Sequence, residues 1–257
     1  MDVTLDPFIW HTPASAVDLM ETEIHVWRAS LRRGEKATAQ LLALLTAQET
    51  ERANRFCFEV DRSAYIAGRG ILRLLLGRYL TQEAFFSEFL YNEYGKPMLP
   101  EGMIARDLRF NLSHADGVAL FAVTCGREVG VDVESVQRNI DYGQVAGRFF
   151  SLRERTTLLS LPAEAQREAF FACWTRKEAY IKARGMGLSL GLDAFDVSLA
   201  PGEPARLLAT RDDPQQAARW SIQALYPGPV LAGALCADGH DWRLRCWQWP
   251  DAGDRVP

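Results

Sequence analysis

The sequence predicts an α+β fold in which two similar α+β halves share one chain. A helical pattern followed by several strand patterns occurs once in each half of the sequence. A turn followed by a buried strand occupies a similar place in each half, at HADGVALFAV (114–123) and at YPGPVLAGAL (226–235). This internal similarity is weak, because no residue-level repeat accompanies it. We expect halves at 1–128 and 129–257, with the ligand site between them.

The first half is expected to contain one strand, two helices and then further strands. ETEIHVWRA (21–29) alternates as a strand does, and Thr46 with Glu49 forms a capping-box pattern that opens a helix through about residue 56. A longer helix is expected over 61–80, with Arg69 and Arg73 on its polar side. Its apolar stripe is made by Tyr65, Leu72, Leu75, Leu76 and Tyr79. Strands are expected at 88–92, 108–112 and 117–125.

The second half begins with a short strand and ends with several more. The first strand is expected at 130–135. Helical periodicity then predicts helices at 143–149, 151–160 and 163–184. Strand patterns return at 194–200, 220–226, 230–237 and 242–249.

The composition is that of an ordinary globular protein and excludes several classes of partner. The chain has 257 residues, of which 48% are hydrophobic and 24% are charged, and its formal net charge is −4. No basic field therefore suggests nucleic acid. The start, MDVTLDPFIW, lacks the pattern of a signal peptide, and no apolar run approaches the roughly 20 residues that cross a bilayer. The five cysteines form no CxxC pair. We expect a cytoplasmic protein with reduced thiols.

Two carboxylates share one face of the strand Gly130-Val-Asp-Val-Glu134. Val131 and Val133 point to one side, whereas Asp132 and Glu134 point to the other, about 6–7 Å apart along the strand. An exposed strand face explains this pattern equally well. The functional interpretation is a site for a hard cation, because Mg²⁺ prefers one or two carboxylates together with phosphate and water oxygens.

A second group of charges lies on the helix that contains WTRKEAYIKARGMGL (174–188). Glu178 and Lys182 are four residues apart and so share a helix face, and Trp174 lies one turn earlier on that face. A surface salt bridge followed by a glycine C-cap at Gly185 is the ordinary explanation. The alternative is that Glu178 is a third acid of the cation site, with Lys182 nearby to complete a metal-phosphate site.

Cations that would suit a phosphate are scattered through the first half. Arg52 and Arg55 are three residues apart on one helix, although Glu51 is placed to pair with Arg55. Lys96 lies in the turn Tyr94-Gly-Lys-Pro97, where a lysine is usually just solvated. Asn111-Leu-Ser-His114 ends a strand. The nucleotide-binding patterns GxxxxGK[ST] and GxGxxG are absent from the sequence.

These motifs, in this order, resemble the 4′-phosphopantetheinyl transferases of the surfactin-synthetase-associated type. The resemblance is carried by Gly130-Val-Asp-Val-Glu134 and by Trp174-Thr-Arg-Lys-Glu-Ala-Tyr-Ile-Lys182 with Gly185-Met-Gly-Leu188. Supporting matches are Tyr94-Gly-Lys-Pro97, Asn111-Leu-Ser-His114 and Arg148-Phe-Phe-Ser151 with Glu154. It covers about residues 40–200. It implies a pseudo-dimeric fold of two similar halves that binds coenzyme A between them.

The resemblance also implies an activity and a role for each motif residue. The enzyme would transfer the phosphopantetheine arm of coenzyme A to a serine of an apo acyl or peptidyl carrier protein, releasing 3′,5′-ADP. Mg²⁺ would be held by Asp132, Glu134 and Glu178 and would bind the pyrophosphate. Glu178 would take the serine proton, directly or through a metal-bound water. Lys182 would stabilise the departing phosphate. Because both half-sites lie in one chain, we expect a monomer.

The same resemblance assigns the remaining contacts to coenzyme A. Arg52, Lys96 and His114 would hold the phosphates and the adenosine end, and Ser113 would add a hydroxyl or backbone contact. Trp174 is expected to pack rather than react. Some relatives carry two lysines where this chain has Glu49 and Arg52, and a small hydroxyl residue where it has Tyr65. The 3′-phosphate is therefore expected to rely on Arg52 and Arg55.

Two other functions remain open from the residues alone. The first is a non-catalytic module that binds coenzyme A or acyl carriers; a degenerate copy of that kind would be expected to lose Asp132, Glu134 or Glu178. The second is a Mg²⁺-dependent nucleotide hydrolase, which would need no carrier protein. The sequence leaves the pathway undecided among fatty-acid, polyketide and non-ribosomal-peptide carriers.

Overall fold

The computed structural model describes residues 9–13, 17–100 and 107–251. The segment MDVTLDPF, where no signal peptide is expected, lies outside these ranges. The elements of the first half are β1 (Glu23–Ser30), α1 (Glu35–Leu42), α2 (Ala47–Ala53), α3 (Glu59–Tyr79), β2 (Leu90–Tyr91), β3 (Pro97–Met98), β4 (Leu108–Ala115) and β5 (Val118–Cys125).

The second half begins at β6 and contains the longest helix, α6. Its helices are α4 (Tyr142–Phe149), α5 (Leu152–Ser160), α6 (Ala163–Arg184) and α7 (Gln216–Arg219), with 3-10 turns at Gly187–Ser189 and Leu192–Ala194. Its strands are β6 (Val129–Ser135), β7 (Phe195–Val197), β8 (Leu207–Thr210), β9 (Trp220–Gly228), β10 (Leu231–Asp238) and β11 (Arg243–Gln248). No helix in the described ranges is long and apolar enough to cross a bilayer.

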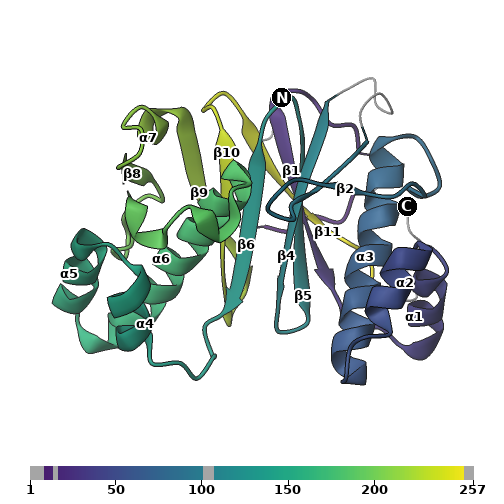
Figure 1. The fold of residues 1–257 in the computed structure, drawn as a ribbon, viewed down its shortest axis with the longest axis horizontal. Helices are drawn as coiled ribbons and strands as arrows, with labels where there is room; N and C mark the ends of the chain where they lie inside the picture. Colours follow the sequence, from purple (N-terminus) through teal and green to yellow (C-terminus); the bar gives the residue numbers. More distant parts are fainter. Residues whose placement is uncertain (1–8, 14–16, 101–106, 252–257) are drawn as a thin grey trace.

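Two sheets stand back to back in the middle of the molecule, and the helices cover their outer faces (Figure 1). The first sheet has the strand order β11-β1-β5-β4, and the second has the order β6-β10-β9. Alternation along each strand divides its side chains between two cores. Ile24 and Val26 of β1 face the second sheet, whereas Trp27 and Ala29 pack with α3. The expected pair of α+β halves is therefore confirmed as an architecture.

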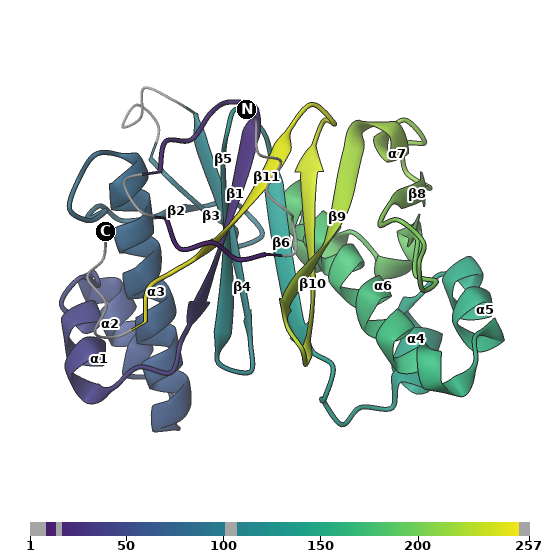
Figure 2. The same cartoon turned by 180° about the vertical axis from the view of Figure 1, so that it is seen from behind.

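The last strand pairs across the expected division at residue 128. β11 follows the whole second half, yet it lies beside β1 in the first sheet (Figure 2). The pairing is parallel, with Glu23 opposite Arg243 and Arg28 opposite Gln248. The first half therefore includes a strand from the far end of the chain.

The long elements match the sequence expectations more closely than the short ones do. The helices expected at 61–80 and 163–184 are α3 and α6, within two residues at each end. The strand expected at 88–92 is only Leu90–Tyr91, and the helix expected through 56 ends at Ala53. The elements α1, β3, β8 and α7 were not expected.

Arg73 corrects the assignment of a polar face to α3. Its side chain is 0% exposed and forms an ion pair with Glu49, from Nε to Oε2 at 2.7 Å. Its Nη1 donates to the carbonyl oxygens of Phe85 at 2.6 Å and Ser87 at 3.0 Å. Glu49 also accepts the backbone N–H of Thr46, so the capping box is present and extends into the core. Arg73 therefore fastens α2 and the segment after α3 to that helix.

A buried histidine makes the stability of the first half depend on pH. His25 lies on β1, with Nε2 3.2 Å from Glu23 Oε2 and Nδ1 2.8 Å from the Tyr79 hydroxyl. Trp27 Nε1 also donates to that hydroxyl, at 2.7 Å. Since a carboxylate only accepts, the neutral imidazole donates from Nε2 and accepts from Tyr79 at Nδ1. Burial lowers the pKa of His25 to about 4, against the opposing effect of Glu23.

Protein stability is expected to fall as the pH drops from about 6.5 to about 4. Over that range the unfolded chain binds a proton at this histidine while the folded protein does not, so the free energy of unfolding should fall by roughly 3 kcal/mol. Urea titrations at pH 7 and pH 5 should show about 2 kcal/mol of this change, because pH 5 lies about 1.5 units below the unfolded pKa. His25→Gln should flatten the dependence, and His240→Gln, at an exposed position, should leave it unchanged. An equal slope in the wild type and His25→Gln contradicts the assignment.

Candidate active site at the seam between the two halves

The candidate site lies where the edge strands of the two sheets, β4 and β6, pack against each other. We call this contact the seam. On β6, Val131 and Val133 pack in the core between the sheets, as the alternation predicts. Asp132 and Glu134 belong to the opposite face, toward α6. The strand thus presents its acids to the helix that carries Glu178 and Lys182.

Gly130 lets α6 approach β6 closely. A Cβ at this position would lie 2.2 Å from the carbonyl oxygen of Ala179 and 2.3 Å from the nitrogen of Ala183. Both atoms belong to the helix backbone, which cannot move aside as a flexible side chain can. The glycine of the motif GVDVE is therefore explained by packing, and it brings Asp132 within reach of α6 side chains.

Lys182 joins three separate motifs at the seam. Its Nζ lies 2.6 Å from Asp132 Oδ1 and 3.0 Å from Ser113 Oγ, and Ser113 Oγ donates to the same Asp132 oxygen at 2.8 Å. Among the described residues Glu178 and Lys182 form no ion pair with each other, so the surface salt bridge suggested by their spacing is absent. Lys182 is directed across the seam instead.

Asn111 has a structural role that its motif does not indicate. Its Oδ1 accepts the backbone N–H of Val131 at 2.9 Å, and Ser113 Oγ accepts that of Val133 at 3.4 Å. These side chains satisfy strand N–H groups that a neighbouring strand would otherwise pair. Because Asn111 and Val131 come from different halves, only the tertiary structure reveals this contact.

Burial and neighbouring negative charges raise the pKa values of two carboxyl groups. Asp132 is 3% exposed, and burial raises its pKa, while Lys182 and Ser113 oppose the rise. Burial also raises the pKa of Glu178, and the charge of Asp132 adds to that effect. Asp132 Oδ2 is buried and has no hydrogen-bond partner among the described residues. An added cation would relieve both the repulsion and the unpartnered oxygen.

Glu134 is near these acids but is paired elsewhere. Arg138 Nη1 lies 2.8 Å from Glu134 Oε2. Within the described ranges no group of three or more His, Cys, Asp or Glu side chains is arranged to hold a metal ion. The site expected from Asp132, Glu134 and Glu178 therefore stays a prediction, with Glu134 bound to an arginine in this arrangement.

The predicted phosphate-binding residues line separate cavities, and Lys96 lines one of about 510 Å³ together with Glu128 and Gly185. Arg52 and Arg55 line a cavity of about 620 Å³ together with Tyr65 and Tyr91. The Arg52 guanidinium lies over the Tyr65 ring, 5.5 Å from its centroid. Arg55 forms an ion pair with Glu51 at 2.6 Å, as their spacing in the sequence suggests. Among the described residues Arg52 has no ion-pair partner, so its charge is available to a ligand.

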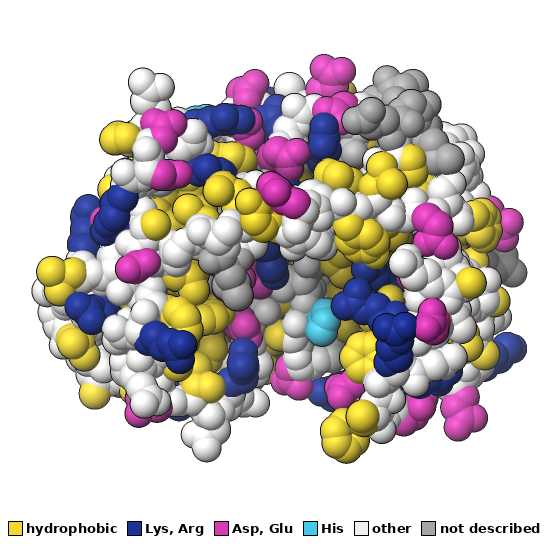
Figure 3. All heavy atoms as spheres, viewed as in Figure 1, with side chains coloured by type: hydrophobic (Ala, Val, Ile, Leu, Met, Phe, Trp, Pro, Cys, Tyr) yellow, Lys and Arg dark blue, Asp and Glu magenta, His cyan; other side chains and the backbone are white. Residues whose placement is uncertain are grey.

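His114 lines a third cavity, of about 550 Å³, together with Glu134 and Arg138. Burial lowers the pKa of His114, and the nearby charge of Lys182 lowers it further. The neutral imidazole is therefore favoured, and it both donates and accepts hydrogen bonds. Figure 3 shows the molecule hollowed between its halves, with basic, acidic and histidine side chains around the hollow.

Lys96 is not a solvated turn lysine in this structure, and its predicted phosphate contact stays a prediction. Its Nζ donates to Glu128 Oε2 at 2.8 Å and to the carbonyl oxygens of Val129 and Ala183, each at 3.2 Å. A lysine has three N–H donors. All of them are therefore directed at protein acceptors.

Other residues of the long helical motif are structural. The expectation that Trp174 packs is confirmed, because its ring stacks on Phe170 at 5.9 Å and lies edge-on to Phe149. Lys177 was not singled out in the sequence, yet it is 0% exposed and pairs with Glu154 at 2.8 Å. This pair holds α6 against α5. Nothing in the local pattern distinguishes Lys177 from a surface lysine.

Two family models match the chain, one in each half. The model described as the 4′-phosphopantetheinyl transferase superfamily matches residues 128–238, and the model of the 4′-phosphopantetheinyl transferase N-terminal region matches residues 27–126.

Curated relatives match over a large share of their own length. The chain is 38% identical over 240 residues to "4′-phosphopantetheinyl transferase HetI" of Nostoc, covering 93% of this chain and 98% of that protein. It is 30% identical over 165 residues to "4′-phosphopantetheinyl transferase Sfp" of Bacillus subtilis, covering 64% and 71%. Among solved structures, the holo-[acyl-carrier-protein] synthase of Thermotoga maritima shares 24% identity with a TM-score of 0.36, over 44% of this chain and 62% of that chain.

Proposed function

Because the chain belongs to the 4′-phosphopantetheinyl transferase superfamily, we propose that it converts apo carrier proteins to their holo forms. It transfers the phosphopantetheine arm of coenzyme A to a carrier serine and releases 3′,5′-ADP. The observation that carries this proposal is the contact of Lys182 with Asp132 and Ser113. That contact brings three separate motifs together between the halves.

The proposal includes the surfactin-synthetase-associated type and a monomeric enzyme. Both halves and the seam between them lie in one chain, which supports this type. The identity to HetI, 38%, exceeds the identity to Sfp, 30%. The division into halves at 1–128 and 129–257 remains part of the proposal, although β11 pairs with β1 in the first sheet. Fatty-acid, polyketide and non-ribosomal-peptide carriers are all candidate substrates.

The residues at the seam fit a divalent cation. Asp132 Oδ2 is a buried oxygen without a hydrogen-bond partner among the described residues. Burial and neighbouring negative charges raise the pKa of both Asp132 and Glu178. Mg²⁺ accepts one or two carboxylates and completes its coordination with water and phosphate oxygens. Asp132 and Glu178 would hold it, with Glu134 joining when Arg138 releases it. The bound ion would neutralise charge on the coenzyme A pyrophosphate.

Chain residues carry the proton and stabilise the leaving group. The carrier serine oxygen attacks the β-phosphorus of coenzyme A, and the bond from that phosphorus to the oxygen shared with the 3′,5′-ADP portion breaks. Glu178 accepts the serine proton, and its raised pKa makes it a stronger base than an ordinary glutamate. Lys182 donates hydrogen bonds to the departing phosphate. Ser113 and His114, at the end of β4, hold neighbouring phosphate oxygens.

Mass spectrometry of an apo carrier tests the proposed function. Incubation with coenzyme A and Mg²⁺ should add one phosphopantetheine group to the carrier and release 3′,5′-ADP in equal amount. A hydrolase would cleave coenzyme A without any carrier, and a binding module would leave both partners unchanged. Either result would replace the proposal with the corresponding alternative.

Arg52 is expected to recognise the 3′-phosphate of coenzyme A. Arg52→Ala should raise the KM for coenzyme A roughly ten- to a hundredfold, because a charge-assisted hydrogen bond is worth about 1.5–3 kcal/mol. The KM for 3′-dephospho-coenzyme A should change much less. Arg55→Ala is the matched control, since Glu51 already holds that guanidinium, and its effect should be smaller. Equal effects of Arg52→Ala on both substrates would move Arg52 away from this phosphate.

A further inference from the structure

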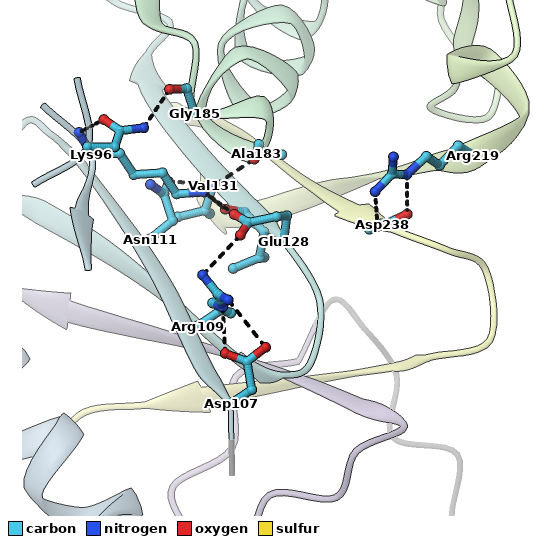
Figure 4. Close-up of polar contacts among 12 residues, drawn as sticks. Lys96, Asp107, Arg109, Asn111, Glu128, Val131, Ala183, Gly185, Arg219 and Asp238 are labelled. Carbon is cyan, nitrogen blue, oxygen red and sulfur yellow. Dashed lines mark hydrogen bonds and ion pairs between the residues drawn. The ribbon is translucent and has the colours of Figure 1, made fainter. Parts of the chain in front are cut away.

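The hairpin formed by β2 and β3 reaches from the first half to the carboxyl end of α6 (Figure 4). Asn92 shapes its loop, because Oδ1 accepts the N–H groups of Tyr94 at 3.0 Å and Lys96 at 2.9 Å. The other end of the same amide, Nδ2, donates to the carbonyl oxygen of Gly185 at 2.7 Å. Lys96 Nζ donates to the carbonyl oxygen of Ala183 at 3.2 Å. The hairpin therefore caps two carbonyl groups at the end of α6.

These carbonyl groups need partners from outside the helix. The last four carbonyl oxygens of an α-helix have no intrahelical partner, and they form the negative end of the helix dipole. A lysine cation and an amide N–H complement that charge. Gly185 allows the close approach, since a Cβ there would lie 3.1 Å from Asn92 Nδ2 and 3.4 Å from Lys96 Cδ. Gly185 also has a φ of +64°, as the left-handed end of the helix requires.

Lys96 connects this cap to the junction between the halves. Glu128 immediately precedes β6, and Val129 is the first residue of that strand. Both residues accept hydrogen bonds from Lys96 Nζ. Glu128 is also held from the first half, because Arg109 Nη1 lies 3.3 Å from its Oε1. The Lys96 side chain is 12% exposed. The ammonium group of Lys96 thus contacts Glu128, the start of β6 and the end of α6.

We propose that Lys96 is a positioning residue that, with Asn92, holds the carboxyl end of α6 in register with β6. Ala183, which accepts from Lys96, directly follows Lys182, and Lys182 contacts Asp132 on β6. Fixing the helix end therefore fixes the amine that stabilises the leaving phosphate. This role replaces a direct phosphate contact for Lys96, and its catalytic consequence rests on the proposed function.

Two variants separate the cap from other roles of the hairpin. Lys96→Met keeps the apolar stem and removes all three donors. Asn92→Asp keeps the Oδ1 acceptor that shapes the loop, but it loses the donor to Gly185 and places a negative charge at the negative end of the helix. Lys36→Met, at an exposed position on α1, is the matched control for loss of a lysine. Steady-state kinetics and hydrogen exchange are measured on all of them.

Both variants should lower kcat about 10- to 100-fold, because small displacements of a catalytic group have effects of this size. The KM for coenzyme A should stay within about twofold of the wild-type value, as expected when a binding contact is retained. Amide exchange over residues 181–190 should become at least about tenfold faster in both variants, while exchange in α3 is unchanged. Lys36→Met should match the wild type in every measurement.

Two results would overturn the proposal. A large rise in the KM for coenzyme A with wild-type kcat would make Lys96 a ligand contact, and wild-type exchange over 181–190 would show that the cap does not hold the helix. If Lys96→Met does not fold, Asn92→Asp decides the question by the same criteria. The exchange measurement needs no carrier protein. A wild-type enzyme that fails to modify carriers would therefore refute the proposed function while leaving the cap itself to be judged by exchange.

Discussion

Asp132→Asn is expected to reduce carrier modification by roughly 10³-fold, the loss typical of removing one central electrostatic group from an active site. The substitution keeps the shape of the side chain and an acceptor for Lys182 and Ser113, but it removes the charge that would hold Mg²⁺. Titration calorimetry should show Mg²⁺ binding to the wild type and none to the variant. The comparison tests the metal assignment independently of turnover.

The fold should survive this substitution. Burial raises the pKa of Asp132, so the folded state disfavours the ionised form and a neutral isostere removes that cost. Thermal melting should therefore change little. Asp193→Asn, at an exposed position in the 3-10 turn Leu192–Ala194, is the matched control for loss of a carboxylate. Full activity of Asp132→Asn in the presence of EDTA would eliminate the proposed metal site.

Glu178→Gln and Lys182→Met are both expected to lose activity, but with different effects on kcat and on the KM for coenzyme A. Glu178→Gln removes the proton acceptor, so kcat should fall by about 10²–10⁴ with little change in the KM for coenzyme A, and added Mg²⁺ should restore little. Lys182→Met removes the charge that binds and stabilises the leaving phosphate. Both kcat and the affinity for coenzyme A should then suffer. Steady-state kinetics with varied coenzyme A separate the two patterns.

Stability gives a second distinction between these variants. Lys182→Met leaves the buried Asp132 carboxylate without its cation, so this variant should melt at a lower temperature than Glu178→Gln. The double variant Lys182→Met/Asp132→Asn should recover stability without recovering activity. Glu168→Gln, at an exposed position on α6, serves as the control. Wild-type turnover by Glu178→Gln or Lys182→Met, with carrier modification confirmed by mass, would return these residues to a structural role.

The sequence predicts what depends on local periodicity. The helices α3 and α6 have long apolar stripes, and their bounds were expected within two residues. The alternation in Gly130-Val-Asp-Val-Glu134 also places Val131 and Val133 in the core between the sheets. By contrast, β8 and α7 have four residues each, too few for a periodic signal.

Long-range partners explain the remaining differences. Arg73 looks polar in a helical pattern, but the carboxylate that allows its burial lies on α2, at Glu49. Lys96 looks like a turn lysine because one of its acceptors, the Ala183 carbonyl, is 87 residues away in the chain. Lys182 looks like the partner of Glu178 until β6 supplies Asp132. For each of these three residues the sequence shows the charge, but only the tertiary structure shows the group that pairs with it.

The return of β11 to the first sheet constrains how this protein is made. Synthesis proceeds from the N-terminus, so β1 and β5 leave the ribosome long before Arg243–Gln248 exists. Until then one edge of β1 has no strand beside it, and unpaired edges invite wrong pairing with other chains. The first half therefore completes its sheet only after the second half has been translated through β10. The pairing of β11 with β1 is thus a late step in the folding of the first half. A nascent chain stalled after β10 would expose the unpaired edge of β1.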